Sequence, residues 1–243
     1  MRRRRQFDGP PVGRLCSIVG QAETLGAGVV FEKTLGTENT LTYVLNPVLQ
    51  RAALVLPIGD GLMRAYLVYR ASQIDRLQGA GDVPRFVDES IRSGLPREFF
   101  VDARAAGPLA SFDMTESWVD HPYRDGLVLI GDAAGSSDPT WGQGLSITMR
   151  DARLLSENLL AVDDWPLACN RYAEARTDYF RRLTRVHEWI FDLFLGEGPE
   201  ADRLRDQALP LLAAQPDRLP DHNFSGPEQP SDDEVRRRFF GEI

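Results

Sequence analysis

The most chemically suggestive stretch of this sequence runs from residue 126 to residue 144 and reads GLVLIGDAAGSSDPTWGQG. Its apolar run, Leu127–Ile130, is typical of a strand that is buried on both faces. The run ends in Gly131 and Asp132, so the strand would deliver a carboxylate to the carboxyl edge of a sheet, where α/β folds bind ligands. A carboxylate there can accept hydrogen bonds from ligand hydroxyls, such as those of a sugar or a ribityl chain.

The far end of the same loop, Gly142-Gln143-Gly144, leads into a helical pattern that starts at Leu145. At a helix start, free backbone N–H groups and the positive end of the helix dipole point toward whatever binds there. The glycines would let that backbone approach a flat ligand closely, while Pro139 stiffens the loop and Trp141 is either an aromatic wall or a packing residue. The loop therefore suits a ligand with hydroxyls at one end and a planar, electron-accepting group at the other. A flavin meets that description, because a helix start would stabilise the negative charge on its pyrimidine edge when the ring is reduced.

Simpler interpretations compete for these residues. Gly131-Asp132 alone is more often a strand-ending turn whose aspartate caps the next segment. The glycine pair, Pro139 and the helix behind them shift the balance to a flavin-type site. The aromatic residues of the last long helical pattern, Tyr172, Tyr179 and Trp189, are typical of a core.

The elements that must position this loop fall into two parts, and the first part is predicted to be sheet. Short segments rich in Val, Leu, Tyr and Thr, separated by turn residues, indicate the strands. Residues 58–61, Ile-Gly-Asp-Gly, predict a hairpin turn between the last two of them. A helix should follow, with Asp82 as N-cap, Pro84 in its first turn and Gly94 at its end. The predicted strands are Gly28–Leu35, Leu41–Leu45, Ala53–Pro57, Leu62–Arg70 and a segment near Leu109–Met114.

The second part is predicted to be helical. One helix of about four turns follows the loop, and a longer one begins at Asp164 as cap, with Pro166 in its first turn. From about Pro216 the chain is rich in Asp, Pro, Arg and Glu, and we expect irregular structure there. The apolar stripe of the first helix is Leu145, Met149, Ala152, Leu155 and Leu159, and that of the second is Tyr172, Ala175, Tyr179, Leu183, Val186, Ile190 and Leu193.

Composition excludes several classes of protein. The 243 residues carry a formal net charge of -8, which argues against nucleic acid as the main partner. The basic run Arg2–Arg5 is expected to be a solvated end or a segment without its natural context, rather than an arm for nucleic acid or membrane. No apolar run has the length needed to span a bilayer, and no signal peptide is recognisable, so a cytoplasmic setting without a membrane partner is the default expectation.

The remaining titratable side chains offer no other chemistry. Cys16 and Cys169 fit no metal or redox spacing. His121, His187 and His222 are isolated in the sequence, with no metal-ligand spacing and no nucleophile motif nearby. A hydrolase triad and a metal centre are therefore both unsupported.

The block GDAAGSSDPTWGQGLSITMRDARLL resembles the second flavin-binding motif of FAD-dependent monooxygenases of the para-hydroxybenzoate hydroxylase-like family. The resemblance implies an α/β to α+β fold: a mixed β-sheet substrate layer with helices, the C-terminal remnant of a doubly wound FAD-binding domain, and long C-terminal helices. It divides the chain into residues 1–124, 125–163 and 164–243. It also implies FAD as cofactor, NADH or NADPH as electron donor, and hydroxylation of an organic, in this family often aromatic, small molecule.

The resemblance also assigns roles to residues. It places Asp132 on the ribityl chain and Pro139 beside the flavin ring near the substrate, where Trp141 would also lie. No side chain is expected to act as a catalytic group, because the flavin carries the chemistry. The family often has His where this chain has Gly135, which we interpret as variation in substrate or cofactor contact. The full expected cofactor-binding set is Asp132, Ala133, Pro139, Gly142, Gln143, Gly144 and Leu145.

The strand–glycine-loop–helix unit that binds the ADP part of FAD in this family, G-x-G-x-x-G, does not occur in the sequence. Gly26-Ala27 and Gly196-Glu197-Gly198 have the wrong context, and the opening MRRRRQFDGPP resembles the stretch that follows the family's second glycine-aspartate signature. We therefore expect this chain to be the C-terminal part of such an enzyme: a truncated product, a mispredicted start, or one half of a split protein.

Two other functions stay open. One is another flavoprotein of the same fold, such as a flavin-dependent halogenase or a prenyl-chain reductase, although the halogenase signature Trp-x-Trp-x-Ile-Pro is not found. The other is a non-catalytic, degenerate half that binds a protein or a small ligand. The DNA upstream of Met1 separates these cases, because an in-frame glycine-rich strand–helix segment there supports the flavoenzymes.

Overall fold

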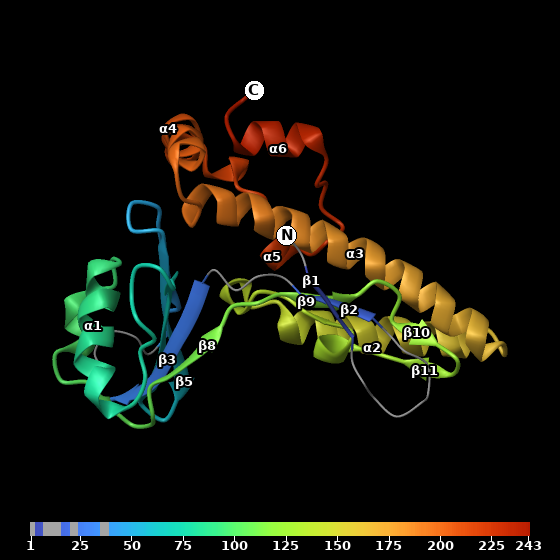
Figure 1. Cartoon of the computed structure of the whole chain (residues 1–243), viewed down its shortest axis with the longest axis horizontal. Helices are drawn as coiled ribbons and strands as arrows, with labels where there is room; N and C mark the ends of the chain where they lie inside the picture. The colour runs from blue at the N-terminus through green and yellow to red at the C-terminus, as the bar shows by residue number, and fades with distance from the viewer. Residues whose placement is uncertain (1–2, 7–15, 20–23, 35–38) are drawn as a thin grey trace. The chain divides into compact units, whose positions relative to one another are not determined.

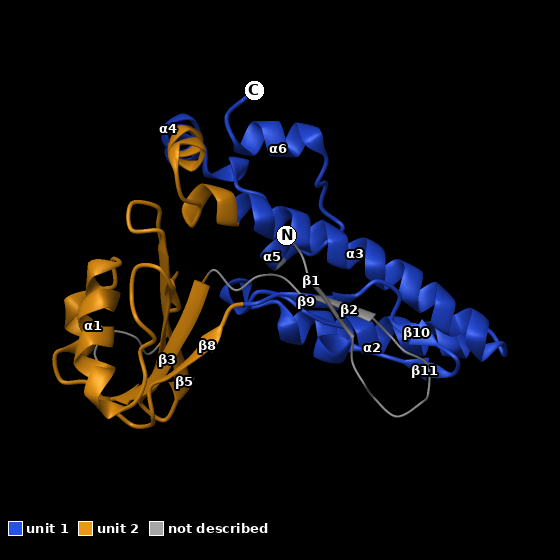
Figure 2. Ribbon diagram, viewed as in Figure 1, with its two compact units in different colours: residues 1–21, 115–190, 206–243 blue, residues 22–114, 191–205 orange. Residues whose placement is uncertain are grey.

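The computed structural model describes residues 3–6, 16–19, 24–34 and 39–243 (Figure 1). The chain forms two compact units (Figure 2). Unit 1 comprises residues 1–21, 115–190 and 206–243, and unit 2 comprises residues 22–114 and 191–205. The expected mixture of sheet and helix is confirmed, and the strand pairs of the described residues are antiparallel.

Unit 2 is built on a six-stranded sheet of order β4-β5-β6-β3-β7, in which β8 also pairs with β3. The predicted hairpin is confirmed, because Asp60 and Gly61 take the positive φ angles, 52° and 73°, that a tight turn requires. The first strand begins earlier than predicted because its glycines lie within the strand under aromatic rings: a Cβ on Gly28 would lie 2.6 Å from Tyr66 Cε1. The strands are β3 (Thr24–Glu32), β4 (Thr42–Asn46), β5 (Arg51–Gly59), β6 (Leu62–Arg70), β7 (Arg104–Ala105) and β8 (Ala110–Asp113).

The predicted helix of unit 2 is α1 (Val83–Arg92), preceded by the short 3₁₀ helix η1 (Ala80–Asp82) and followed by η2 (Arg97–Phe100). Asp82 occupies its N-cap, as predicted, but the carboxylate accepts a hydrogen bond from Gln78 N at 2.9 Å instead of capping the helix. Apolar side chains of α1 and of alternating strand positions form the core of this unit. They include Phe86 with Leu25, Ala27, Val29, Phe31, Ala65, Leu67 and Tyr69.

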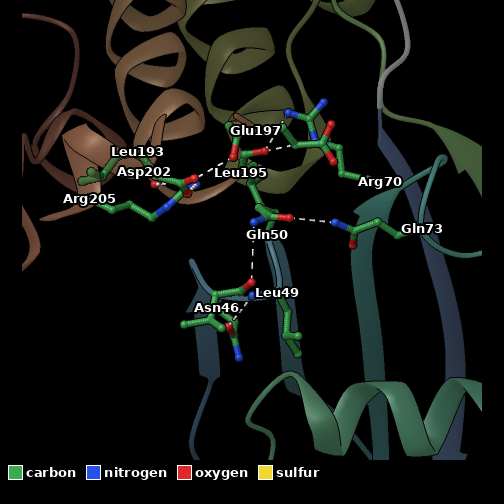
Figure 3. Close-up of polar contacts among 12 residues, drawn as sticks. Asn46, Leu49, Gln50, Arg70, Gln73, Leu193, Leu195, Glu197, Asp202 and Arg205 are labelled. Atoms are coloured by element: carbon green, nitrogen blue, oxygen red, sulfur yellow. Dashed lines mark hydrogen bonds and ion pairs between the residues drawn. The ribbon is translucent and has the colours of Figure 1, made fainter. Parts of the chain in front are cut away.

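Two buried arginines fix the segment of unit 2 where α3 (Trp165–Phe194) ends and α4 (Pro199–Ala214) begins (Figure 3). Arg70 Nη2 donates to Leu195 O at 2.7 Å, and Arg205 Nη1 donates to Leu193 O and Gly196 O. A cation at a helix C-terminus satisfies unpaired carbonyls and complements the helix dipole. Both arginines thus have a structural role in this unit.

Unit 1 contains a small antiparallel sheet of order β1-β2-β9-β12 and the hairpin β10-β11. The run Leu127–Ile130, predicted as a strand buried on both faces, is a two-residue strand paired only with β10 within the described chain. That prediction is wrong: Leu127 and Ile130 are 40% and 36% exposed. The strands are β1 (Arg3–Gln6), β2 (Cys16–Val19), β9 (Ser117–Val119), β10 (Tyr123–Arg124), β11 (Leu127–Val128) and β12 (Gly135–Ser136).

The helix after the loop is confirmed as α2 (Gly144–Ala161), but its predicted apolar stripe is not its buried face. Leu145 and Met149 are 72% and 67% exposed, whereas Ile147 and Asp151 are buried. Ile147 packs with Tyr179, Phe180 and Leu183 of α3. The stripe of α3 is buried as predicted except at Ala175, and its predicted cap is confirmed by the Leu167 N to Asp164 Oδ1 bond of 3.0 Å.

The segment after Pro216 is more ordered than predicted. It contains η5 (Pro216–Arg218), α5 (His222–Ser225) and α6 (Asp233–Phe239). Asp232 caps α6 by accepting from Val235 N at 3.0 Å, and Phe239 and Phe240 are buried. Acidic residues in its first turn and arginines in its last turn complement the helix dipole, so the charges that suggested irregular structure stabilise a short helix.

The basic run at the N-terminus was expected to be a solvated end. Its described part, Arg3–Gln6, pairs with Cys16–Val19 as strand β1, and Arg2 lies outside the described residues. Among the described helices, none combines the length and the apolar character that crossing a membrane requires.

Candidate functional site

The loop between β11 and α2 lies in unit 1 and consists of the two short 3₁₀ helices η3 (Gly131–Ala133) and η4 (Pro139–Trp141) with β12 between them. Its residues divide into an outward and an inward set. The outward, exposed residues are Asp132, Ala133, Pro139, Gly142 and Leu145, with Gly144 partly exposed. The inward, buried residues are Ala134, Gly135, Ser137, Asp138, Thr140, Trp141 and Gln143. All residues predicted to bind cofactor are therefore outward, except Gln143.

The two ends of the loop meet. A Cβ built on Gly144 would lie 3.7 Å from Asp132 Oδ1, so the carboxylate stands beside the start of α2. Gln143 occupies the N-cap without capping the helix, because its Nε2 donates to Asn223 O at 3.0 Å and Trp141 O at 3.4 Å. Among the described residues, no side chain thus caps the first turn of α2, and a carboxylate and a helix start converge on one exposed surface.

Asp138, which the sequence analysis missed, shapes the middle of the loop. Its Oδ1 accepts from Thr140 N at 2.7 Å, which caps η4, and the turn ends at Gly142 with φ at 68°. Burial raises the pKa of the Asp138 carboxyl, although its hydrogen bonds with Thr140 pull the pKa down. The Asp-Pro-Thr order is a turn signal that could have revealed this cap.

Trp141 and His187 pack together on the buried side of the loop. The Trp141 ring is buried and stacks on His187, with the ring centroids 5.5 Å apart and the planes at 24°. His187 Nε2 lies 3.0 Å from Asn223 Oδ1, and burial lowers the pKa of His187 to about 4. In this structure Trp141 packs inside the unit, and His187, isolated in the sequence, supports the loop.

Asp151 and Arg176 lie directly beneath the Gly131-Asp132 turn. Gly131 N donates to Asp151 Oδ2 at 2.7 Å, and Arg176 Nε lies 3.1 Å from the same oxygen. Burial raises the pKa of Asp151 despite the opposing effect of the Arg176 charge. Asp151 lies within the motif, but the sequence assigns it no role, because nothing local signals a partner 25 residues away.

Gly135 stands where the resembling family often has His, and the structure gives a packing reason. A Cβ on Gly135 would lie 2.9 Å from Ser117 O and 2.9 Å from Trp118 Cβ, because β12 pairs closely with β9. From the sequence, this departure was interpreted as variation in substrate or cofactor contact. The observed geometry shows that residue 135 is buried and faces a neighbouring strand instead.

The arrangement fits the flavin end of FAD. Hydroxyls of a ribityl chain can donate to Asp132, and a ring edge can face the uncapped start of α2. A pyrophosphate needs a different environment, usually a glycine loop at a helix start. The candidate glycines do not supply it, because Gly26 lies inside β3 and the pair Gly196 and Gly198 lies between α3 and α4.

Comparison with protein families gives a match to the family described as FAD binding domain, over residues 21–185. Two curated relatives are kynurenine 3-monooxygenases. That of Salinispora tropica is 32% identical over 131 residues, which are 47% of this chain and 29% of the relative. That of Salinispora arenicola is 31% identical over 146 residues, which are 53% of this chain and 31% of the relative. The match therefore spans less than a third of either relative.

Solved structures show the same fold. The flavin-dependent brominase Bmp2 aligns with a TM-score of 0.59 at 16% identity, over 91% of this chain and 56% of that one. HpxO of Klebsiella pneumoniae, solved with FAD and uric acid, aligns with a TM-score of 0.55 at 16% identity, over 90% of this chain and 52% of that one. At these identities the likeness concerns the fold alone.

Proposed function

Because this chain belongs to the FAD-binding domain family, we propose that it forms the flavin-end portion of an FAD-dependent monooxygenase. The observation that carries the proposal is the convergence of Asp132 with the uncapped start of α2 on one exposed surface. The kynurenine 3-monooxygenase relatives support the reaction class. In this proposal the substrate is a small organic molecule with an aromatic ring.

Each part of the loop has a defined task in this proposal. Asp132 accepts hydrogen bonds from ribityl hydroxyls, which fixes the cofactor along its length. The backbone of residues 142–145 would hold the pyrimidine edge, where the helix dipole would favour negative charge. Pro139, exposed at the start of η4, would border the ring and the substrate. Bound FAD, reduced by NADH or NADPH, supplies the oxygen chemistry, while the protein orients the reactants and excludes water.

The proposal requires a second contributor for the ADP part of FAD. The flavin end makes only one of the two sets of contacts that hold FAD. Without contacts to the ADP end, the flavin is no longer kept at a high effective concentration near its own site. We propose that a dinucleotide-binding half, either in the same polypeptide or as a separate chain, completes the site. The exposed apolar side chains Leu145 and Met149 of α2 support this, because large apolar groups on one helix face usually pack against a partner.

Titration of flavins into the purified chain tests the proposal. We expect weak, unsaturated quenching of FAD fluorescence at micromolar concentrations, similar quenching of FMN, and no oxidation of NADH or NADPH. Stoichiometric quenching by FAD, or steady NADPH turnover, would show that the site is complete and contradict the need for a second half. A chain that quenches neither FAD nor FMN up to millimolar concentration contradicts the flavin site itself.

A further inference from the structure

The segment that carries Asp132 is held at three backbone positions by side chains of two helices. Tyr172 OH of α3 donates to Leu129 O at 2.9 Å, before the turn. Gly131 N donates to Asp151 Oδ2 of α2 at 2.7 Å, within it. After the turn, Arg176 Nη2 of α3 lies 3.4 Å from Gly135 O. The bonds therefore bracket Asp132 on both sides along the chain.

The three side chains that make these bonds are buried. The side chains of Asp151 and Arg176 are 0% and 1% exposed, and Tyr172 is also 0% exposed. A buried ion pair is weak evidence for stability, because a well-packed apolar pair of similar volume is often as stable. This pair is also incompletely satisfied, since Asp151 Oδ1 is buried and makes no hydrogen bond within the described chain. This pair therefore orients the Gly131 backbone and adds little net stability.

The turn itself leaves little freedom. Gly131 has φ at 56°, and a Cβ on it would lie 2.6 Å from Thr148 Oγ1. Thr148 Oγ1 donates to Gly144 O at 2.9 Å, in the first turn of α2. Gly131 thus packs closely against Thr148, whose hydroxyl is bonded to the helix start beside Asp132. A shift of the Gly131 backbone would change the distance between the Asp132 carboxylate and that helix start.

We propose that Asp151, Arg176 and Tyr172 are positioning residues that fix the Gly131-Asp132 turn, so that Asp132 stays aligned with the first turn of α2. The consequence for ligand affinity rests on the proposed flavin function. The consequence for the turn does not, because the three bonds are present in the protein by itself. The two parts can therefore be tested separately.

The first test uses two tyrosines of α3. Tyr172→Phe removes the bond to Leu129 O together with the interaction of the hydroxyl with the Asp151 carboxyl. Tyr179→Phe is a matched control, because the buried Tyr179 hydroxyl has no hydrogen-bond partner in the described structure. We expect amide exchange in residues 127–137 to become about two- to ten-fold faster in Tyr172→Phe and unchanged in Tyr179→Phe. The β5–β6 hairpin is the internal reference. Equal exchange of residues 127–137 in both variants would overturn the role of Tyr172.

The second test uses the ion pair. Asp151→Ala removes the acceptor of Gly131 N and should speed exchange of that amide by roughly ten- to a hundred-fold. The double change Asp151→Asn with Arg176→Gln removes both charges and the bond from Arg176 to Gly135 O, but keeps an oxygen for Gly131 N. Protection of the Gly131 amide alone should therefore return to within about three-fold of the parent. Unchanged protection in Asp151→Ala, or no recovery in a folded double variant, overturns the role of the pair. If Asp151→Ala does not fold, amide exchange in the double variant and in the two tyrosine variants still tests the proposal.

The third measurement separates the inference from the proposed function, using FMN as probe. Where the parent chain quenches FMN fluorescence, Asp151→Ala should weaken affinity about ten-fold. The double variant keeps the bond at Gly131 but not the one at Gly135, so it should recover part of that affinity. Faster exchange with unchanged FMN affinity would overturn the positioning of Asp132 for the ligand. A parent chain that does not bind FMN would contradict the proposed function, while amide exchange would still decide whether the three residues fix the turn.

Discussion

Asp132 is the side chain on which the proposed site depends most, and its exposure leaves it available to a ligand. In a form of the protein that retains FAD, Asp132→Ala should lower the retained flavin by about ten-fold or more, because hydrogen bonds to a charged acceptor are lost. Asp132→Asn should be milder, since its amide oxygen still accepts. Flavin absorbance per mole of purified protein measures the effect. Asp120→Ala, at another exposed aspartate of unit 1, is the control. A variant as yellow as the parent would count against this role of Asp132.

His187 should make the free energy of unfolding depend on pH. Burial lowers its pKa in the folded state to about 4 from 6.5, so below pH 6.5 the unfolded state binds the extra proton. The free energy of unfolding should therefore fall by about 3 kcal/mol as pH falls from 7 to 4, relative to His187→Gln. Urea denaturation across this range measures the difference.

The variant comparison isolates the histidine, because the raised pKa values of Asp138 and Asp151 act in the opposite direction and are shared by both proteins. For these carboxyls the folded state binds the extra proton, so their contribution weakens the folded state as pH rises. The exposed His121 supplies a second control, His121→Gln. Parallel stability curves for the parent and His187→Gln would contradict a neutral, buried His187.

At the scale of elements, the pairing of β12 with β9 determines which residue can stand at position 135. Gly135→Ala should lower the free energy of unfolding by about 1–3 kcal/mol, because its methyl group would press on Ser117 O and Trp118. Gly107→Ala is the matched control, since a Cβ there meets nothing within 4 Å. Chemical denaturation of both variants tests the argument. If Gly135→Ala were as stable as Gly107→Ala, β9 and β12 would have to move apart at little cost in free energy.

The two faces of helix α2 have different functions. Its buried face, with Ile147 and Asp151, packs on α3 and reaches the Gly131 backbone. Its outer face begins at Leu145, beside the exposed surface that we assign to the flavin. A single helix thus joins the loop to the core and leaves its first turn available to a ligand.

At the scale of the whole molecule, the exposed apolar side chains of α2 should make the isolated chain associate. Met149 and Leu160 are 67% and 86% exposed. We expect concentration-dependent oligomers at micromolar protein, and Met149→Gln with Leu160→Gln should shift the population toward monomer. Analytical ultracentrifugation measures the fractions of monomer and oligomer. Val48→Gln, at an 82% exposed valine of unit 2, should have no effect. A parent chain that stays monomeric at high concentration would contradict this expectation.

Local sequence signals were enough to identify the family, the strands β3 to β6 and β8, and the helices α1 to α3. The block from Gly131 to Leu155 predicted a flavin-type fold because its spacing of Asp, Pro and Gly is set by local backbone requirements, and the family match confirms that assignment. Strand β6 and the starts of α2 and α3 were also predicted, since alternation, caps and turn glycines act over a few residues. Such short-range signals can be read without knowledge of the rest of the molecule.

Long-range packing determines which faces are covered and which distant side chains meet. The apolar stripe of α2 predicted burial of Met149, yet Asp151 is the buried residue because its partner Arg176 comes from another helix. Trp141 could not be assigned from the sequence, since its stacking partner His187 lies far along the chain. Periodicity shows that a helix has an apolar side. What packs against that side depends on long-range contacts, which no local pattern encodes.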